Sequence, residues 1–284
     1  MFEVGEARFC CQISFRRRGE NSSCVVQRSV IAFKLAAAAE PKVTMSKGKI
    51  FFDLDNTLYS YEATGLHIAM RKHIDSYFAK HLDIPDAEAA ELANTYYHKY
   101  GLAGLGLLNH HADKVDIEDY LAYVHDELPV DETLKADPAL AATLTKLGGD
   151  GWESWIFTNS TIRHARRCLK ALGVHEAFVT ADGVERIVEI DTMWKGTREM
   201  ACTGNKAVNK PDAGAYDVMA AVSGLKEGEK AVMVEDSPAN LAVPKQRGWV
   251  PVWIGHGSAK VPAAVTDAGY VVINAIDELA AKLD

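Results

Sequence analysis

The sequence lacks the features that mark membrane-spanning, disulfide-stabilised and nucleic-acid-binding proteins. No apolar run reaches the roughly 18–20 residues that a bilayer-spanning helix needs. The 5 cysteines are odd in number, irregular in spacing and without a CxxC pair, which argues against a disulfide framework and favours a reducing compartment. Basic residues number 31 against 39 acidic ones, a net charge of -8, so we expect no broad surface for nucleic acid or an anionic membrane.

The rest of the composition is that of an ordinary globular protein. The chain has 284 residues, of which 48% are hydrophobic and 25% charged, enough for one large domain or two modest ones. The acidic balance does not exclude an anionic substrate, because a bound metal and one well-placed lysine can reverse the sign of the charge locally. Helical and extended patterns alternate along the chain, which favours an α/β protein.

The first 45 residues differ from the remainder. They contain Arg16-Arg17-Arg18 and several serines but little apolar periodicity. We interpret residues 1–45 as a poorly ordered extension, or as lying upstream of a true start at Met45. A transit peptide is the alternative, although four glutamates count against it because such segments are poor in acids. We therefore expect a cytoplasmic protein, or an organellar one if this segment is a targeting signal.

Short apolar runs ended by polar residues or glycine predict six strands, and helical patterns lie between them. The predicted strands are Ile50–Leu54, Ser154–Phe157, Ala177–Thr180, Ala231–Val234, Val250–Ile254 and Tyr270–Ile273. The predicted helices between them are Thr161–Leu172, Ala213–Val222 and Ser237–Arg247. Strands that alternate with helices predict a Rossmann-like, doubly wound parallel sheet.

One region interrupts this alternation. Residues 61 to about 148 show no convincing strand and have helical periodicity throughout. The predicted helices are Thr64–His81, Asp86–Tyr100, Asp116–Glu127 and Pro138–Leu147, the last of which returns to the sheet domain. We therefore predict a core made of residues 46–60 and 136–284, with a helical insert over residues 61–135.

Two carboxylates lie at the C-terminal end of the first predicted strand. Asp53 and Asp55 are two residues apart, so in a strand they point to the same side and repel each other unless a cation or a shared proton intervenes. Ligands of open α/β sheets bind beyond the carboxyl ends of the strands. Hard oxygen ligands in this place favour Mg²⁺, with a surface turn that carries two acids as the alternative.

Chemically matched residues follow two other predicted strands and precede a helix. Thr158-Asn159-Ser160 leads from a strand into a helix, where a hydroxyl and backbone N–H groups can bind phosphate oxygens. Glu235-Asp236 ends another strand, and Lys210-Pro211 precedes a helix. Taken singly, each could be a helix cap or a solvated lysine. Together they predict one site for phosphate chemistry.

This set of residues resembles the haloacid dehalogenase superfamily in its phosphatase branch. The DxDxT signature stands as Asp53-Leu54-Asp55-Asn56-Thr57, the second motif as Thr158, the third as Lys210 and the fourth as Glu235-Asp236-Ser237. The resemblance covers roughly residues 48–260. It implies that the strands ending at Phe157 and Val234 flank the first one, and that the helical insert is a cap of the C1 type.

The resemblance also implies the catalytic roles. Asp53 would be the nucleophile that forms an aspartyl-phosphate, and Asp55 would protonate the leaving alcohol and then activate water. Lys210 would orient Asp53 and offset charge on the transferring group. Dehalogenases of the superfamily lack an acid at the position of Asp55, so its presence favours phosphate chemistry.

Binding roles follow in the same way. Thr158 and the backbone of Asn159 would hold phosphate oxygens. Mg²⁺ would be bound by Asp53, Asp236 and the backbone carbonyl of Asp55. These assignments fit the general logic of phosphoryl transfer, in which positioning and charge neutralisation dominate.

The substrate is predicted from a closer resemblance to the pyrimidine 5′-nucleotidases of fungi and plants. That resemblance rests on Asp55-Asn56-Thr57-Leu58-Tyr59, on the stretch Tyr100–His111 and on the residues from Phe157 to Leu169. It implies a nucleoside 5′-monophosphate, with His111 as a substrate ligand or, alternatively, a polar residue at a helix end. A sugar-phosphate phosphatase, a phosphomutase and a non-catalytic regulatory protein are the other hypotheses. Oligomeric state is left open.

One stretch departs from this group. Residues 187–209 are longer than the usual link before the motif-three lysine, and we interpret them as a lid or a loop. The stretch contains Lys195 and Lys206, which rival Lys210 for the catalytic role. Lys210 is preferred because Pro211 follows it.

Overall fold

The computed structural model describes residues 46–200, 207–258 and 260–283, and for residues 197–200 it describes the backbone alone. The predictions for residues 1–45, and Lys206 as a rival lysine, lie outside the described residues. Within the described ranges, no helix is both long enough and apolar enough to cross a membrane.

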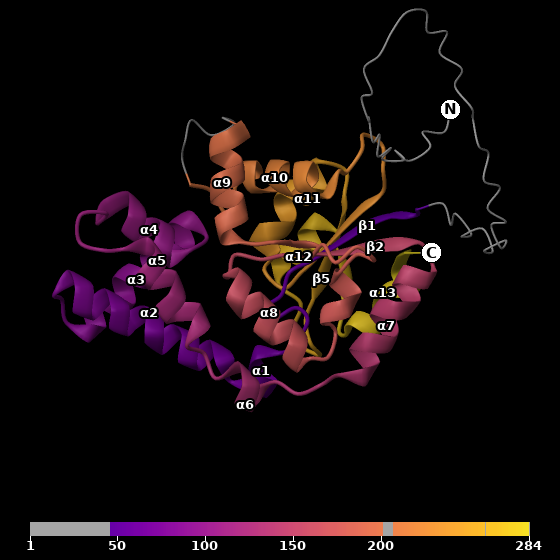
Figure 1. Ribbon diagram of the computed structural model, residues 1–284. Coiled ribbons are helices and arrows are strands. Elements are labelled where there is room, and N and C mark those ends of the chain that lie inside the picture. The colour runs from indigo at the N-terminus through magenta and orange to yellow at the C-terminus, as the bar shows by residue number, and fades with distance from the viewer. Residues whose placement is uncertain (1–45, 201–206, 259, 284) are drawn as a thin grey trace, which may run out of the picture. The chain divides into compact units, whose positions relative to one another are not determined.

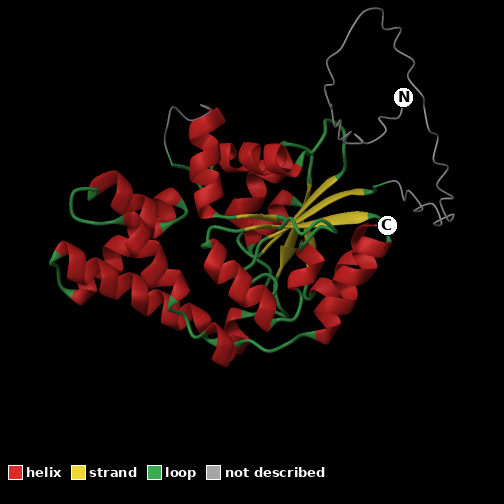
Figure 2. Cartoon of the chain, viewed as in Figure 1, coloured by secondary structure: helices red, strands yellow, loops and turns green. Residues whose placement is uncertain are grey.

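The centre of the fold is a six-stranded sheet in which every pair of neighbours is parallel (Figure 2). The strands lie in the order β3-β2-β1-β4-β5-β6. Their bounds are β1 Gly48–Phe52, β2 Trp152–Phe157, β3 Ile187–Val188, β4 Ala231–Glu235, β5 Val250–Ile254 and β6 Val271–Ile273. The predicted doubly wound parallel sheet is confirmed. Strands β2 and β4 flank β1, which makes the end of β1 a topological switch point, where such folds bind ligands.

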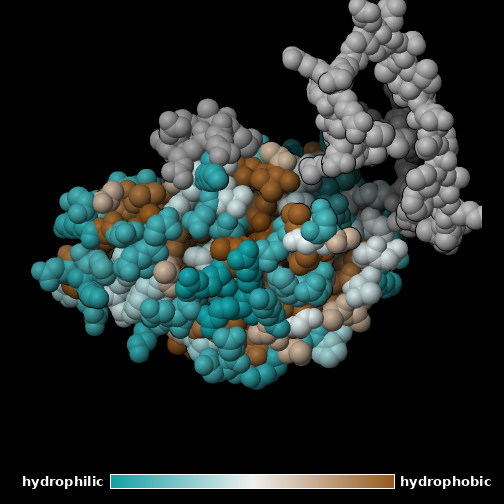
Figure 3. Space-filling view, viewed as in Figure 1, coloured by the Kyte–Doolittle hydropathy of each residue, from teal (hydrophilic) through white to brown (hydrophobic). Residues whose placement is uncertain are grey.

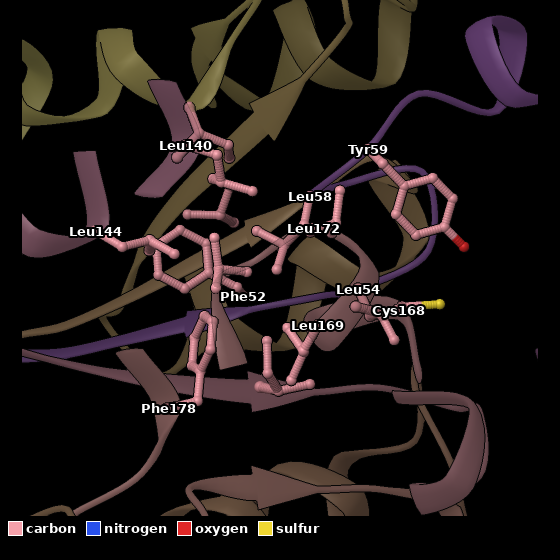
Figure 4. Close-up of a cluster of buried hydrophobic side chains, with 14 of the residues drawn as sticks. Phe52, Leu54, Leu58, Tyr59, Leu140, Leu144, Cys168, Leu169, Leu172 and Phe178 are labelled. Atoms are coloured by element: carbon pink, nitrogen blue, oxygen red, sulfur yellow. The ribbon is translucent and has the colours of Figure 1, made fainter. Parts of the chain in front are cut away.

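The sheet is buried on both faces, as alternate side chains of its central strand show. Ile50 and Phe52 of β1 belong to one apolar cluster, and Phe51 between them belongs to another. Figure 4 shows Phe52 packed among leucines of α7 and α8 and against Phe178. Fully burying one such side chain contributes about 1.5–3 kcal/mol. The packing fixes the strand ends relative to one another.

Helices cover the sheet, and further helices, from α2 to α5, lie to one side of it (Figure 1). Those of the sheet domain are α7 Pro138–Gly149, α8 Ile162–Ala171, α9 Ile190–Met200, α10 Ala213–Ser223, α11 Ala242–Gln246, α12 Ala263–Ala268 and α13 Leu279–Leu283. On the face seen in Figure 3, hydrophilic residues predominate and the hydrophobic ones form small separate groups.

The third strand is not where the sequence predicts it. Residues 177–180 were predicted to be a strand because they form a short apolar run, but His175–Phe178 is a 3-10 turn. Phe178 is fully buried against Phe52, with ring centroids 6.2 Å apart. The run is hydrophobic because it fills the core and not because it joins the sheet. The actual third strand, β3, pairs with the end of β2.

The described part of residues 187–209 before position 201 forms a strand and a helix of the sheet domain and is not the loop that the sequence suggested. It begins with β3 and continues into α9, whose first turn is capped by the Glu189 carboxylate, which accepts from the backbone N–H groups of Asp191 and Thr192 at 2.9 Å each. Gly196 lies so close to α10 that an added Cβ would meet Val218 at 2.7 Å. The length of the link is therefore explained by an additional packed helix.

The insert between β1 and α7 is helical, as predicted. Its helices are α1 Tyr61–Thr64, α2 Leu66–Leu82, α3 Asp86–Tyr100, α4 Ala103–His110, α5 Ile117–Leu121 and α6 Val130–Thr133, with a π-helical turn at Ala122–Asp126. Helix α4 was not predicted. Its sequence holds Gly104 and Gly106, which disfavour helix, but an added Cβ would meet the Tyr120 and Tyr96 rings at 2.5 and 2.2 Å. Tight packing against aromatic rings overrides the low propensity.

The return from the insert is fixed to α8 by one arginine. Arg167 donates to the backbone carbonyls of Asp126 and Leu128 at 2.5 and 3.0 Å, and to the Asp131 carboxylate at 2.9 Å. Thr161 at the start of α8 also donates to the Asp126 carboxylate, at 2.6 Å. These contacts connect the helical insert to the strand end that precedes α8.

Candidate active site

The carboxyl ends of β1, β2 and β4 meet at one edge of the sheet. Asp53 follows β1 directly, and its backbone N–H donates to the Val234 carbonyl of β4 at 2.9 Å. Thr158 follows β2 and is 1% exposed. Here the sheet and the helical insert border a cavity of about 420 Å³. The sheet side of its lining includes Asp53, Asp55, Thr158, Asn159, Lys210, Glu235 and Asp236.

Lys210 joins two of these acids. Its Nζ donates to Asp53 Oδ1 at 2.6 Å and to Glu235 Oε2 at 2.7 Å, and all three side chains are almost fully buried. Burial would lower the pKa of Lys210, but the two carboxylates outweigh it and raise that pKa above its usual value. Lys210 therefore remains a cation that touches Asp53 directly. Glu235, which the sequence marked only as an acid at a strand end, is its second partner.

Asp236 is held on the other side of the cluster by the loop after β1. Asn56 donates from Nδ2 to Asp236 Oδ2 at 2.7 Å. The backbone of Asn56 has a φ of 59°, a left-handed conformation that asparagine tolerates better than most residues. The backbone N–H of Tyr61 donates to Asn56 Oδ1 at 2.9 Å. The DxDxT loop is thus tied both to the end of β4 and to the start of the helical insert.

The donor set fits a hard divalent cation. Asp53, Glu235 and Asp236 each offer a carboxylate oxygen, and these oxygens lie within 4.8 Å of one another. Burial, with repulsion from Glu235, raises the pKa of Asp53 to about 7, and the same two causes raise the pKa of Asp236 well above its usual value. Lys210 supplies one positive charge against three carboxylates. A second cation with oxygen ligands, such as Mg²⁺, would relieve the remaining repulsion.

These shifts predict that Mg²⁺ stabilises the protein more at pH 8 than at pH 5. The folded-state pKa values of Asp53 and Asp236 are raised. The metal-free folded protein therefore keeps protons that the unfolded chain releases above about pH 4. As a result, the metal-free protein loses stability as the pH rises through 7. Mg²⁺ binds the deprotonated carboxylates. At 100 times its Kd, a ligand adds about 2.7 kcal/mol, or roughly 5–10 °C in Tm.

Thermal unfolding with and without MgCl₂ at the two pH values measures this effect. We expect a shift at pH 5 less than half of that at pH 8, and no shift for Asp236→Asn at either pH. Equal Mg²⁺ shifts at both pH values in the parent protein would contradict the assignment of these carboxylates as ligands.

Asp55 also lines the cavity but is hydrogen-bonded in a separate network. Its Oδ1 accepts from the Tyr59 hydroxyl and from His164 Nε2, the latter at 2.7 Å, and its Oδ2 accepts from Ser160 Oγ at 2.5 Å. Burial would raise the pKa of Asp55, but the charge and hydrogen bond of His164, with the two hydroxyls, outweigh it and hold that pKa below its usual range. The sequence had assigned no role to Tyr59, Ser160 or His164.

At the end of β2, Thr158 is bonded locally and Asn159 connects the strand end to the lysine segment. Thr158 Oγ1 accepts from the backbone N–H of Ser160 at 3.0 Å. The Asn159 side chain pairs twice with the backbone of Lys210, accepting from its N–H and donating to its carbonyl, both at 3.0 Å. The Asn159 side chain thereby positions Lys210. The sequence predicted only that the Asn159 backbone binds phosphate, and it did not indicate this contact.

Two residues singled out in the sequence lie away from the cavity lining. His111 ends α4, and its Nε2 is 2.9 Å from the hydroxyl of Tyr96, so the ring is engaged within the helical insert. Its position gives no support to its predicted role as a substrate ligand. Lys195 is exposed on α9 and does not line the cavity, whereas Lys210 does.

The helical insert contributes aromatic and basic side chains to the cavity. Tyr97 and Lys99 of α3 line it, together with Tyr61 of α1 and Met70 of α2. Tyr97 is 51% exposed, one of four large hydrophobic residues exposed among those described. Sequence reasoning missed these residues because neighbouring positions at the end of α3 point to different sides, Tyr96 into the core of the insert and Tyr97 into the cavity. A run such as Tyr96-Tyr97 does not say which tyrosine faces which side.

Comparisons with known proteins agree with this architecture. A family model described as haloacid dehalogenase-like hydrolase matches residues 50–248. Phosphate metabolism protein 8 of Saccharomyces cerevisiae is 31% identical over 220 residues, which are 75% of this chain and 63% of the yeast protein. The chain thus spans less than two thirds of the length of that relative.

Solved structures resemble the fold at lower identity. A hydrolase from Pseudomonas syringae superposes with a TM-score of 0.55 at 18% identity, over 83% of this chain and 97% of its own. A Thermotoga maritima protein provisionally described as a β-phosphoglucomutase gives a TM-score of 0.50 at 20% identity, over 83% and 98%. At these identities the likeness concerns the fold alone.

Proposed function

The chain belongs to the haloacid dehalogenase-like hydrolases, and from that premise we propose that it hydrolyses phosphomonoesters through an aspartyl-phosphate on Asp53. The observation that carries this proposal is the position of Lys210, whose Nζ lies 2.6 Å from Asp53 at the head of a cavity. A buried carboxylate held by a lysine is an oriented nucleophile with positive charge beside it. Both are what transfer of an anionic phosphoryl group requires.

The reaction has two half-steps. An oxygen of Asp53 attacks phosphorus, the ester P–O bond breaks, and the leaving alkoxide takes a proton from the Asp55 carboxyl group. In the free protein Asp55 is ionised and paired with His164. It gains that proton in the substrate complex, where the negative phosphate raises the pKa of Asp55. Water then attacks the aspartyl-phosphate, giving its proton to Asp55 as the bond between Asp53 and phosphorus breaks. Free phosphate and the alcohol are the products, and both aspartates return to their starting states. Thr158 lies at the end of β2 in the same cavity, where its hydroxyl can bind a phosphate oxygen.

Mg²⁺ is the cofactor in this proposal. Asp53 and Asp236 would hold it with their carboxylates, and Asp55 with its backbone carbonyl; Glu235 is engaged with Lys210. When bound, the ion offsets negative charge on the phosphoryl oxygens. The remaining work is done by this chain's side chains, which orient the nucleophile, neutralise charge and move the proton.

We propose a nucleoside 5′-monophosphate, in particular a pyrimidine one, as the substrate, and the helical insert as a C1 cap that selects it. The cavity volume of about 420 Å³ is in the range of small-molecule sites. Tyr61 and Tyr97 offer aromatic rings on its cap side, where a base can stack, and Lys99 offers a cation. The name of the yeast relative, a phosphate metabolism protein, is in keeping with a phosphate ester.

A phosphate-release panel tests the proposed function. We expect purified protein with Mg²⁺ to release phosphate from UMP and CMP with higher kcat/KM than from sugar phosphates, flavin mononucleotide or p-nitrophenyl phosphate. Tyr97→Ala should raise the KM for UMP about tenfold, because base stacking contributes about 1–3 kcal/mol, and leave the KM for p-nitrophenyl phosphate unchanged. Isomerised sugar phosphate without free phosphate would indicate a mutase instead. No turnover of any ester would support a non-catalytic role.

A further inference from the structure

Asp55 is hydrogen-bonded to a buried histidine, His164, which has no hydrogen bond to Lys210 or its two carboxylates among the described contacts. Assuming the proposed phosphatase reaction, we propose that His164 is a positioning residue that holds the Asp55 carboxyl group in one orientation at the cavity wall. His164 Nε2 lies 2.7 Å from Asp55 Oδ1, and the imidazole is 0% exposed. It therefore acts on the reaction through Asp55 and not on the substrate.

The position of the imidazole is fixed by the start of α8. Thr161 caps that helix and accepts from the backbone N–H of His164 at 3.2 Å. One turn later, Cys168 places its sulfur 3.4 Å from His164 Nε2. Figure 4 shows the Cys168 sulfur and the Tyr59 hydroxyl at the same edge of the packed carbons. The Tyr59 hydroxyl donates to Asp55, and polar atoms of Asp55, His164 and Cys168 lie within 4.8 Å of one another. The ring is confined by its own helix and by the loop after β1.

A second histidine, His125, lies beside the His164 ring. His125 lines the cavity, and its ring centroid is 5.9 Å from that of His164. It lies in the π-helical turn Ala122–Asp126, a local deviation of a kind that is frequent at functional sites. Its Nδ1 is 3.2 Å from the Leu121 carbonyl, which fixes its ring as well. His164 thus has little freedom to leave Asp55.

His164 is the basic partner of an acid that shares the cavity with three other carboxylates. Asp53, Asp55, Glu235 and Asp236 all line the cavity, and Lys210 is engaged by Asp53 and Glu235. Tyr59 and Ser160 give Asp55 only neutral donors, so His164 is the one basic partner among its described contacts. A buried ion pair is often no more stable than a well-packed apolar pair, and stability alone would not require it. The contact instead fixes the direction of the Asp55 carboxyl group, because Nε2 of the buried ring lies 2.7 Å from Oδ1.

Loss of the His164 contact should affect substrates differently according to their leaving group. A positioned acid matters for an alkyl phosphate such as UMP, whose alkoxide must be protonated, and little for p-nitrophenyl phosphate, whose phenolate leaves unaided. We use kcat/KM because it reports the steps up to departure of the leaving group. His164→Asn, whose amide does not reach the position of Nε2, should lower kcat/KM for UMP by about 10–100-fold and that for p-nitrophenyl phosphate less than about threefold.

Matched variants separate positioning from folding. His164→Gln, whose longer amide does reach the position of Nε2, should restore most of kcat/KM for UMP. His175→Asn removes a histidine that pairs with Glu185 at 2.9 Å outside the cavity and should change neither substrate. Thermal unfolding is followed for each variant. If His164→Asn does not fold, His164→Leu, which keeps the apolar contacts, takes its place.

The outcomes distinguish this inference from the proposed function. If the parent protein hydrolyses both esters and the His164 variants lose both equally, or lose neither, the positioning role is wrong and the phosphatase assignment stands. Failure of His164→Gln to restore UMP turnover also overturns it. If the parent hydrolyses no ester, the proposed function fails and the inference fails with it.

Discussion

Replacing Asp53 with asparagine is expected to lower kcat by at least about 10⁴-fold, the scale on which loss of a covalent nucleophile is felt. The amide is nearly isosteric with the carboxylate but has no negatively charged oxygen to attack phosphorus. Lys210 can still donate to the amide oxygen, so the cavity keeps its shape. The effect should be on kcat, with substrate KM changed little.

The same substitution should leave the fold intact or make it more stable. Burial and, after it, repulsion from Glu235 raise the pKa of Asp53 to about 7. At pH 8 without metal Asp53 is therefore ionised although its surroundings disfavour the charge, which lowers the stability of the fold. A neutral amide removes that repulsion. We expect the metal-free variant to unfold at the same temperature as the parent or higher at pH 8, and the difference to vanish near pH 5.

Two measurements complete the test. Mass spectrometry of acid-quenched reactions should detect a phosphoryl adduct on the parent protein and none on Asp53→Asn. Asp191→Asn is the matched control, because the pKa of Asp191 is also raised, to about 6 and chiefly by burial, yet Asp191 does not line the cavity. Near-normal turnover by Asp53→Asn would contradict the assigned mechanism. An equal loss of kcat in Asp191→Asn would indicate a general effect of charge removal.

The sheet edge could be predicted from sequence because parallel strands bring their carboxyl ends together. Asp53 and Asp236 follow or end strands whose apolar runs are clear, and the strand order β2-β1-β4 then makes them neighbours. Lys210 could be placed only by resemblance, since its loop belongs to no strand. The adjacency of the strand ends predicts only that these side chains lie close together. Their catalytic roles remain proposals.

The parts that sequence reasoning missed depend on packing between distant segments. His164 lies in a helix whose apolar face is obvious, but its contact with Asp55 spans 109 positions and has no local signature. Helix α4 was missed because its glycines are explained only by the rings they touch. His111 was assigned to the substrate by resemblance alone. Its ring and that of His110 contact the hydroxyls of Tyr96 and Tyr100, and its role as a substrate ligand stays a prediction.

Replacing Lys210 with methionine should damage both stability and activity. Methionine fills a similar volume, but Asp53 and Glu235 would lose the cation that lies 2.6 and 2.7 Å from them. Breaking a buried pair on one side costs about 3–5 kcal/mol, which corresponds to roughly 6–20 °C in Tm for a domain of this size. Activity should fall by about 10²–10³-fold or more, since a charge that stabilises the transferring group is gone.

A double substitution separates the two effects of Lys210. Adding Glu235→Gln to Lys210→Met removes the facing carboxylate, so most of the lost Tm should return, whereas kcat should not. The reason is that stability depends on the balance of buried charge around Asp53, while catalysis depends on a cation in contact with it. Lys195→Met, on the exposed face of α9, should alter neither quantity. Recovery of kcat together with Tm would show that Lys210 serves the fold alone, and the mechanism would then lose its cation.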